Sequence, residues 1–162
     1  MKVVMTGGGT AGHVNPALSI AGIIKKYEPD SVVEFIGTER GLENRLVPRN
    51  GYKMHKIEVM GLSRSLSPKN IKAAILAYTS YQKCKKILRE VKPDVVIGTG
   101  GYVSWPVVRA AASMGIPCAL HEANAVPGFA VKMLKNKADV VFVNFEETGN
   151  ILGSKKAEVI HT

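Results

Sequence analysis

A glycine-rich turn that directly follows a short apolar run constrains this sequence more than any other feature. Residues 2–6 (KVVMT) have the composition of a buried strand, and Gly7, Gly8, Gly9 and Gly12 come after them. Glycine allows a sharp turn and a close approach to a ligand, because no Cβ stands in the way. A strand, a glycine turn and a helix in succession place free N–H groups and a positive helix dipole at one point. This stretch therefore predicts a site for a phosphate or another anion.

The helix is expected to begin at about Asn15, because Pro16 suits the first turn of a helix. His13 lies just before it. An imidazole exchanges protons near neutral pH, so a histidine at the mouth of an anion-binding turn suggests acid–base chemistry or sugar recognition. The alternative is that His13 only bonds to local backbone.

The spacing Gly7-x-Gly9-x-x-Gly12 also fits the dinucleotide-binding fingerprint. That fingerprint requires an acidic residue at the end of the second strand, where it binds a ribose. The second expected strand, 32–36, ends in Gly37-Thr38, and Glu39 comes late. The sequence therefore disfavours a nicotinamide or flavin oxidoreductase.

Apolar strands and amphipathic helices alternate along the whole chain. The expected strands are 2–6, 32–36, 52–59, 95–97, 116–120, 140–143 and 158–160, and the expected helices are 17–26, 42–49, 70–91, 106–114, 127–134 and 146–152. Such alternation predicts an α/β protein, a Rossmann-like open parallel sheet with helices on both faces. A length of 162 residues suits one domain, spanning 1–162.

Three turns with polar residues follow expected strands, at 7–13, 98–102 and 121–124. The carboxyl ends of parallel strands share one edge of the sheet, and ligands bind there near the point where the strand order reverses. The three turns therefore predict one shared pocket. Apart from the glycines, its candidate residues are His13, Tyr102, His121, Glu122 and Asn124.

The net charge of +9 calls for an anionic partner, whether nucleic acid, lipid headgroups or a phosphorylated substrate. Aromatic residues make up only 6% of the chain, and the basic residues are spread over several segments. Neither feature is typical of a nucleic-acid stacking platform, so nucleic acid is not an expected partner.

The two cysteines, Cys84 and Cys118, have no metal-ligand spacing and are expected to be reduced, buried thiols of a cytosolic protein. No signal peptide precedes the first expected strand. No apolar run reaches the ~20 residues that a membrane span needs. These features predict a soluble or peripheral protein.

Four segments resemble the amino-terminal half of the MurG family of bacterial N-acetylglucosaminyltransferases. They are GGGTAGHVNPAL (7–18), TERGLENRLVP (38–48), PDVVIGTGGYVS (93–104) and GIPCALHEANAVPG (115–128). The resemblance covers essentially the whole chain. It implies one half of a GT-B fold, in which two Rossmann-like domains flank the active site. The carboxy-terminal nucleotide-sugar domain would then be missing from this chain.

The resemblance also implies a reaction. N-acetylglucosamine passes from UDP-N-acetylglucosamine to the C4 hydroxyl of an N-acetylmuramyl-pentapeptide on undecaprenyl pyrophosphate, which makes lipid II from lipid I for peptidoglycan. An α-linked donor that gives a β-linked product requires direct displacement, with a base and a stabilised leaving diphosphate. No Asp-x-Asp motif is present to hold a metal, so neither metal nor cofactor is expected. This domain alone is expected to be inactive.

His13 is the first candidate base, or the group that positions the acceptor hydroxyl. Glu122 is the alternative base, although it is equally expected to cap only the next helix. The resemblance implies donor contacts at Thr10, Ala11, Gly12 and Asn124, and acceptor or diphosphate contacts at Gly8, Gly9, Gly100, Gly101 and Tyr102.

The longest expected helix carries an apolar and aromatic stripe with lysines beside it, which suits the headgroup boundary of an anionic membrane. Its residues are Lys69, Lys72, Ile75, Leu76, Tyr78 and Tyr81. Taken with the family resemblance, the stripe implies a cytoplasmic protein, peripheral on the inner face of the bacterial cell membrane. The alternative is plain core packing.

Three positions depart from the family pattern. Ala123 interrupts the usual HEQN, which puts the polar contacts of that turn in doubt. Trp105 replaces the usual glycine after GYVS and places a large aromatic near the acceptor. Ala11 replaces a common glycine, at little cost if its φ is negative.

A second interpretation belongs to a different functional class. The chain would be a non-catalytic subunit that recruits a separate nucleotide-sugar subunit to a membrane. The cleft residues would be the same in both cases.

Overall fold

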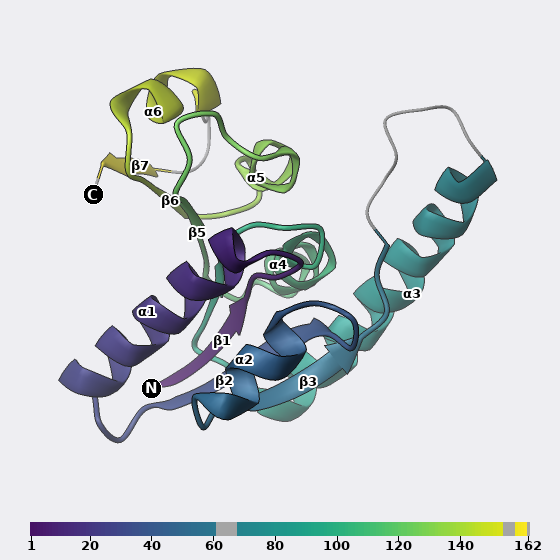
Figure 1. Ribbon diagram of the computed structural model, residues 1–162, viewed down its shortest axis with the longest axis horizontal. Helices are drawn as coiled ribbons and strands as arrows, with labels where there is room; N and C mark the ends of the chain where they lie inside the picture. Colours follow the sequence, from purple (N-terminus) through teal and green to yellow (C-terminus); the bar gives the residue numbers. More distant parts are fainter. Residues whose placement is uncertain (61–67, 154–157, 162) are drawn as a thin grey trace.

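The computed structural model describes residues 1–60, 68–153 and 158–161, and gives residues 68–74 by their backbone alone. Seven strands form one sheet in the order β3-β2-β1-β4-β5-β6-β7, and all neighbours are parallel (Figure 1). The strands are β1 (Lys2–Thr6), β2 (Val32–Thr38), β3 (Lys53–Ile57), β4 (Val95–Gly98), β5 (Cys118–Glu122), β6 (Val140–Val143) and β7 (Glu158–His161). The predicted α/β, Rossmann-like parallel sheet is confirmed.

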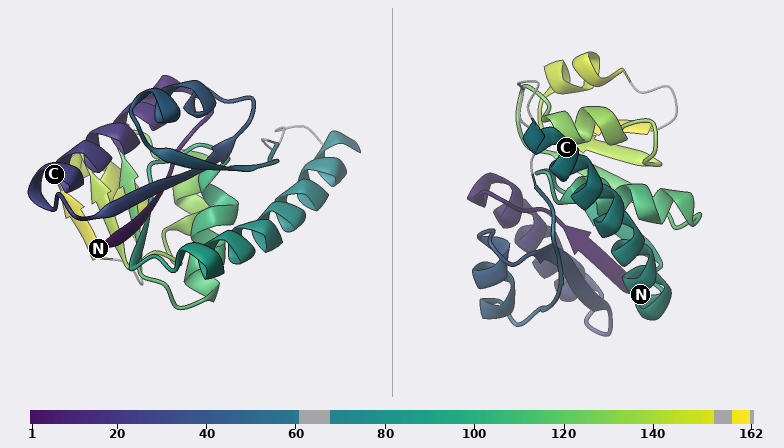
Figure 2. Two further views of the ribbon diagram at one scale, coloured as in Figure 1. Left: turned by 90° about the horizontal axis from the view of Figure 1, so that it is seen from below. Right: turned by 90° about the vertical axis from the view of Figure 1, so that its right-hand side faces the viewer.

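Helices cover both faces of this sheet. They are α1 (Ala11–Tyr27), α2 (Glu43–Arg49), α3 (Pro68–Val91), α4 (Ser104–Ser113), α5 (Phe129–Leu134) and α6 (Glu146–Leu152). The first two lie on the opposite side of the sheet from α3 and α4 (Figure 2). The protein has two hydrophobic clusters, one on each face of the sheet, because side chains along β1 alternate between the faces. Val3 and Met5 pack with Ala17 of α1, whereas Val4 belongs to the cluster that contains Leu88 of α3.

The strand order reverses beside β1. From β1 the chain moves outward to β2 and β3, crosses back through α3 to β4, and then moves outward the other way. The turns after β1 and β4 therefore leave the sheet side by side, where open α/β sheets bind ligands. A backbone hydrogen bond joins the two strand ends, since Thr99 N donates to the carbonyl oxygen of Thr6 over 2.8 Å.

Helix α1 begins at Ala11, so the expectation of a start near Asn15 is wrong. Thr10 is extended and caps the helix, and the N–H groups of His13 and Val14 both donate to its carbonyl oxygen. Pro16 therefore lies in the second turn rather than the first. The glycine turn is shorter than predicted, and His13 sits on a helix instead of a loop.

The third strand-end turn also starts later than expected. Strand β5 runs to Glu122, because backbone pairing with β6 continues to the register pair Glu122 and Val143. His121 and Glu122 are strand residues, and the turn begins at Ala123. Helix α4 begins two residues earlier than expected, at Ser104, so Trp105 lies in its first turn.

Both cysteines are free and buried, as predicted. Burial raises the pKa of the Cys84 thiol to about 12. Within the described parts of the chain, no helix combines the length and apolarity needed to cross a membrane.

Candidate active site

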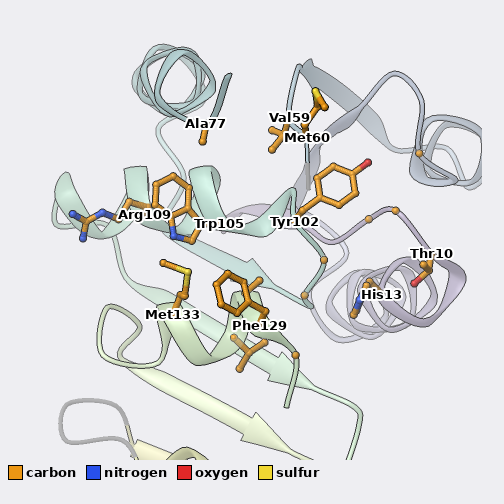
Figure 3. Close-up of a pocket in the computed structure, with 18 of the residues that line it drawn as sticks. Thr10, His13, Val59, Met60, Ala77, Tyr102, Trp105, Arg109, Phe129 and Met133 are labelled. Carbon is orange, nitrogen blue, oxygen red and sulfur yellow. The ribbon is translucent and has the colours of Figure 1, made fainter. Parts of the chain in front are cut away.

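A cavity of about 1130 Å³ opens where β1 and β4 end. Its polar part is made by the two glycine turns and the start of α1, and its apolar part lies between α3, α4 and α5. Figure 3 shows Thr10 and His13 on one side, Trp105, Phe129 and Met133 on the other, and Tyr102 between them. One continuous space therefore joins a polar, backbone-rich region to an apolar one.

The two glycine turns fit together too tightly for side chains. A Cβ on Gly101 would lie 2.2 Å from the carbonyl oxygen of Gly8, and one on Gly9 would lie 3.0 Å from the ring of Tyr102. Both glycines have positive φ, +79° at Gly101 and +87° at Gly9, which other residues rarely adopt. The sequence-predicted residues Gly8, Gly9, Gly100, Gly101 and Tyr102 all line the cavity.

His13 is held in one orientation by the turn after β4. Its Nδ1 lies 3.2 Å from the carbonyl oxygen of Thr99, while Thr99 Oγ1 donates to the carbonyl oxygen of His13 over 2.6 Å. A carbonyl can only accept, so Nδ1 carries the proton in the neutral ring and Nε2 keeps its lone pair. The partner is 86 residues away in sequence, so this contact is not a local backbone bond. His13 can therefore accept a proton at Nε2.

Glu122 is 2% exposed, and both of its oxygens are engaged. Oε1 accepts from the backbone N–H of Asn124 over 3.0 Å and from its side-chain Nδ2 over 2.7 Å. Oε2 accepts from Gly128 N over 2.7 Å, directly before α5. These bonds support the alternative in which Glu122 caps the next helix, although the residue also lines the cavity. A role as base stays a prediction.

The remaining predicted residues lie at the same edge but outside the lining formed by the described residues. Ala11 and Gly12 form the exposed first turn of α1, beside Thr10, which does line the cavity. Asn124 is exposed and turns its amide to Glu122. His121 is half-buried in β5, in register with Phe142.

The three departures from the family pattern have clear structural settings. Ala11 has negative φ, so its extra methyl group costs little. Ala123 is half-buried in the turn that Glu122 organises. Trp105 forms part of the apolar wall, next to Arg109 (Figure 3).

The stripe on α3 divides between exposed and packed residues. Ile75 is 60% exposed and Tyr78 is 64% exposed, whereas Leu76 is half-buried. Tyr81 packs against the core and donates a hydrogen bond to Ser113 Oγ over 2.9 Å. The core-packing alternative therefore applies to Tyr81 but not to Ile75 or Tyr78. The side chains of Lys69 and Lys72 lie outside the described residues.

Sequence reasoning missed Glu43, a buried carboxylate that binds the first glycine turn. Glu43 Oε2 accepts from Gly9 N over 2.9 Å, and Oε1 accepts from Thr38 N and Thr38 Oγ1 over 3.0 and 2.7 Å. An acidic residue in the first turn of a short helix ordinarily indicates only a favourable interaction with the helix dipole. No local signal in the sequence pointed to a contact with a turn 34 residues earlier.

Side chains of both signs line the cavity. Arg40 and Arg109 both line it, and Glu122 supplies a carboxylate. Among the described residues, no group of three or more His, Cys, Asp or Glu side chains comes together as a possible metal site. Two arginines and exposed amides at the start of α1 suit an anionic ligand.

The chain resembles known proteins along nearly its whole length. The family described as the glycosyltransferase family 28 N-terminal domain matches residues 3–143. The UDP-N-acetylglucosamine–N-acetylmuramyl-(pentapeptide) pyrophosphoryl-undecaprenol N-acetylglucosamine transferase of Acetivibrio thermocellus is 47% identical over 162 residues, all of this chain and 44% of the relative. The protein of that name from Lactococcus lactis subsp. cremoris is 46% identical over 156 residues, 96% of this chain and 44% of the relative.

A solved structure shows the same fold. The crystal structure of Acinetobacter baumannii MurG matches with a TM-score of 0.82 and 31% identity, over 98% of this chain and 45% of that one. The chain thus spans less than half the length of these relatives. The family model matches most of the chain, and a relative is 47% identical over all of it. This chain therefore belongs to glycosyltransferase family 28, as an amino-terminal domain of the MurG type.

Proposed function

We propose that this chain is the acceptor-binding half of an inverting N-acetylglucosaminyltransferase that converts lipid I to lipid II. The observation that carries the proposal is the continuous cavity that joins two glycine turns to an apolar wall. The proposed acceptor has the same division, since a sugar diphosphate is joined to a polyprenyl chain. Relatives of more than twice this length carry the name of that transferase.

The proposed chemistry uses the orientation of His13. Nε2 accepts the proton of the acceptor C4 hydroxyl while its oxygen attacks C1 of the donor sugar. The C1–O bond to UDP breaks as the new C1–O4 bond forms, and UDP leaves with the bonding electrons. N–H groups at the start of α1, at Ala11 and Gly12, supply positive potential for a diphosphate. Glu122 is less suited to act as base because both of its oxygens already accept hydrogen bonds.

Binding of the donor, UDP-N-acetylglucosamine, is proposed to depend mainly on a second domain outside residues 1–162. The donor contacts expected from this half are Thr10, Ala11, Gly12 and Asn124. Titration of the chain with UDP-N-acetylglucosamine and with a soluble lipid I analogue, separately, tests the assignment. We expect measurable binding of the acceptor analogue and feeble binding of the donor. Tight binding of NAD with neither of these ligands would overturn the proposal.

We also propose that α3 meets the inner face of the cell membrane, which would keep the lipid acceptor in the bilayer during transfer. Exposed Ile75 and Tyr78 support this, because apolar and aromatic side chains beside lysines suit the headgroup region. Charge reversal at Lys69 and Lys72 is expected to lower binding to vesicles that contain phosphatidylglycerol. Charge reversal at Lys26 and Arg49, which are exposed in the last turns of α1 and α2, is the control. Unchanged binding after reversal at Lys69 and Lys72 would remove α3 from the membrane contact.

A further inference from the structure

Glu43 is 1% exposed and lies in a space that only glycines leave open. A Cβ on Gly41 would lie 2.0 Å from Glu43 Oε2, and one on Gly8 would lie 2.5 Å from its Cδ. A Cβ on Gly37 would lie 2.7 Å from its Cγ. These glycines come from the turn after β1, from β2 and from the segment before α2. Three separate segments thus enclose one carboxylate.

The hydrogen bonds of Glu43 indicate that its side chain is an ionised carboxylate. Three donors point at it, namely Gly9 N, Thr38 N and Thr38 Oγ1, at 2.9, 3.0 and 2.7 Å. An ionised carboxylate only accepts, and two oxygens offer enough lone pairs for three donors. Buried charge of this kind is tolerated when such bonds replace water.

The hydrogen bond between Gly9 N–H and Glu43 determines which backbone N–H groups of this turn are free to bind a ligand. Gly9 N–H is directed at Glu43, so it does not face the cavity. A Cβ on the same residue would lie 3.0 Å from the ring of Tyr102, in the turn after β4. The turn after β1 is therefore clamped between Glu43 on one side and the turn after β4 on the other. The start of α1, including Thr10 and His13, follows directly from this clamped turn.

We propose that Glu43 is a positioning residue that holds the turn after β1 in the conformation that receives the acceptor diphosphate. The inference rests on the function proposed above and extends it to a side chain outside the cavity lining. Glu43 does not touch the ligand. Its carboxylate sets the path of the backbone between Gly8 and Thr10, and through that path it sets the direction of the first N–H groups of α1.

Replacing the carboxylate by an amide of the same size tests this role. In Glu43→Gln, the side-chain NH₂ faces a backbone N–H or the Thr38 hydroxyl, so one donor loses its acceptor. We expect the affinity for inorganic pyrophosphate to fall about tenfold or more. Amide hydrogen exchange at Gly9 should become faster in the same variant. Glu147→Gln, an equal charge change in the exposed first turn of α6, is the control and should change neither quantity.

A second pair of variants keeps the test decisive if Glu43→Gln does not fold. Thr38→Val keeps the shape of the side chain and the charge of Glu43 but removes the hydroxyl donor. We expect weaker pyrophosphate binding in Thr38→Val and near-normal binding in Thr38→Ser, which restores the hydroxyl. Isotope-labelled amide spectra of the same samples report whether Gly9 moves.

The outcomes separate positioning from plain stabilisation of the fold. A lower unfolding temperature with unchanged affinity for pyrophosphate, in folded Glu43→Gln or Thr38→Val, would overturn the inference. Fast exchange of the Gly9 amide in the unmodified chain would overturn it as well. An unmodified chain that binds neither pyrophosphate nor the soluble lipid I analogue gives a different result, because that would overturn the proposed function and this inference with it.

Discussion

Two buried glutamates, Glu43 and Glu122, lie at the same edge of the sheet. Both bind backbone N–H groups of a turn, but the residues that they bind lie at different separations along the sequence. They are 1% and 2% exposed, and each accepts hydrogen bonds from backbone N–H groups of a turn. Glu122 binds Asn124 and Gly128, two and six residues further along its own turn. Glu43 reaches Gly9, 34 residues back in the chain. One carboxylate organises its own loop, and the other joins two elements that only the sheet brings together.

This difference decides how much depends on each glutamate. The turn after β5 stays within one segment, so its disruption should remain local. The turn after β1 is enclosed by Glu43 on one side and by the turn after β4 on the other, with no space to adjust. We therefore expect changes around the first glycine turn to cost more and to spread further than changes around Glu122.

The largest effect is expected at Gly101, where the two glycine turns meet. A Cβ in Gly101→Ala would lie 2.2 Å from the Gly8 carbonyl oxygen, at φ +79°. The positive φ alone costs about 1–2 kcal/mol, and displacing the neighbouring backbone should raise the loss to about 3–5 kcal/mol. Urea unfolding measures it. Gly115→Ala is the control, since Gly115 has φ +70° and open space around it. Equal losses in the two variants would mean that the turns are not tightly interlocked.

A smaller and more local effect is expected at Glu122. In Glu122→Gln, one of the donors at Asn124 or Gly128 faces an NH₂ group, which costs about 1–3 kcal/mol. Amide exchange should become faster at Gly128 and stay unchanged at Gly9. Faster amide exchange at Gly9 in Glu122→Gln would show that Glu122 also affects the turn that Glu43 binds. The effect of Glu122 would then not be local. Asn124→Ala, which removes only the side-chain donor, should cost less than Glu122→Gln.

The smallest effect is expected from Glu34, a partly buried carboxylate that binds side chains rather than backbone. Burial raises the pKa of Glu34, but hydrogen bonds with His55 and Lys53 outweigh it and lower that pKa below 4.5. A lowered pKa in the folded state contributes stability above the unfolded pKa, and this contribution is lost as the pH falls through the folded value. Glu34→Gln should lower stability by at most about 1 kcal/mol near neutral pH.

The pH dependence provides the check on Glu34. The difference in urea midpoint between Glu34→Gln and the unmodified chain should shrink as the pH is lowered below about 4.5. The exposed variant Glu147→Gln should show no such trend. A constant difference across that range would mean that the bonds to His55 and Lys53 do not hold the charged form of Glu34.

Much of the fold could be predicted because its signals are local. Alternating apolar strands and helices indicated the parallel sheet. Every expected strand is present, β1 and β6 with the expected bounds and the other five with shifted ends. Composition reveals neither the helix caps nor the strand pairing that shift the ends of the elements. Thr10 starts α1 before Pro16 because its carbonyl accepts from His13 and Val14. Strand pairing extends β5 to Glu122.

The candidate site was only partly predictable. The glycine spacings marked both turns, and the segments that resemble MurG marked His13 and Tyr102, which line one cavity. Asn124 and Gly12 lie at the same edge outside that lining. Glu43 was not found at all, because its spacing within α2 carries no sign of a partner in another turn.

The sequence by itself determined the alternation of strands and helices, the glycine turns at the strand ends and the membership of the family. Each of these signals lies in residues that are close together in the chain. Only the tertiary structure decided which nitrogen of His13 is left free, which glycines enclose Glu43, and which face of α3 stays exposed. These features depend on contacts between segments dozens of residues apart, and such contacts exist only once β1 lies between β2 and β4.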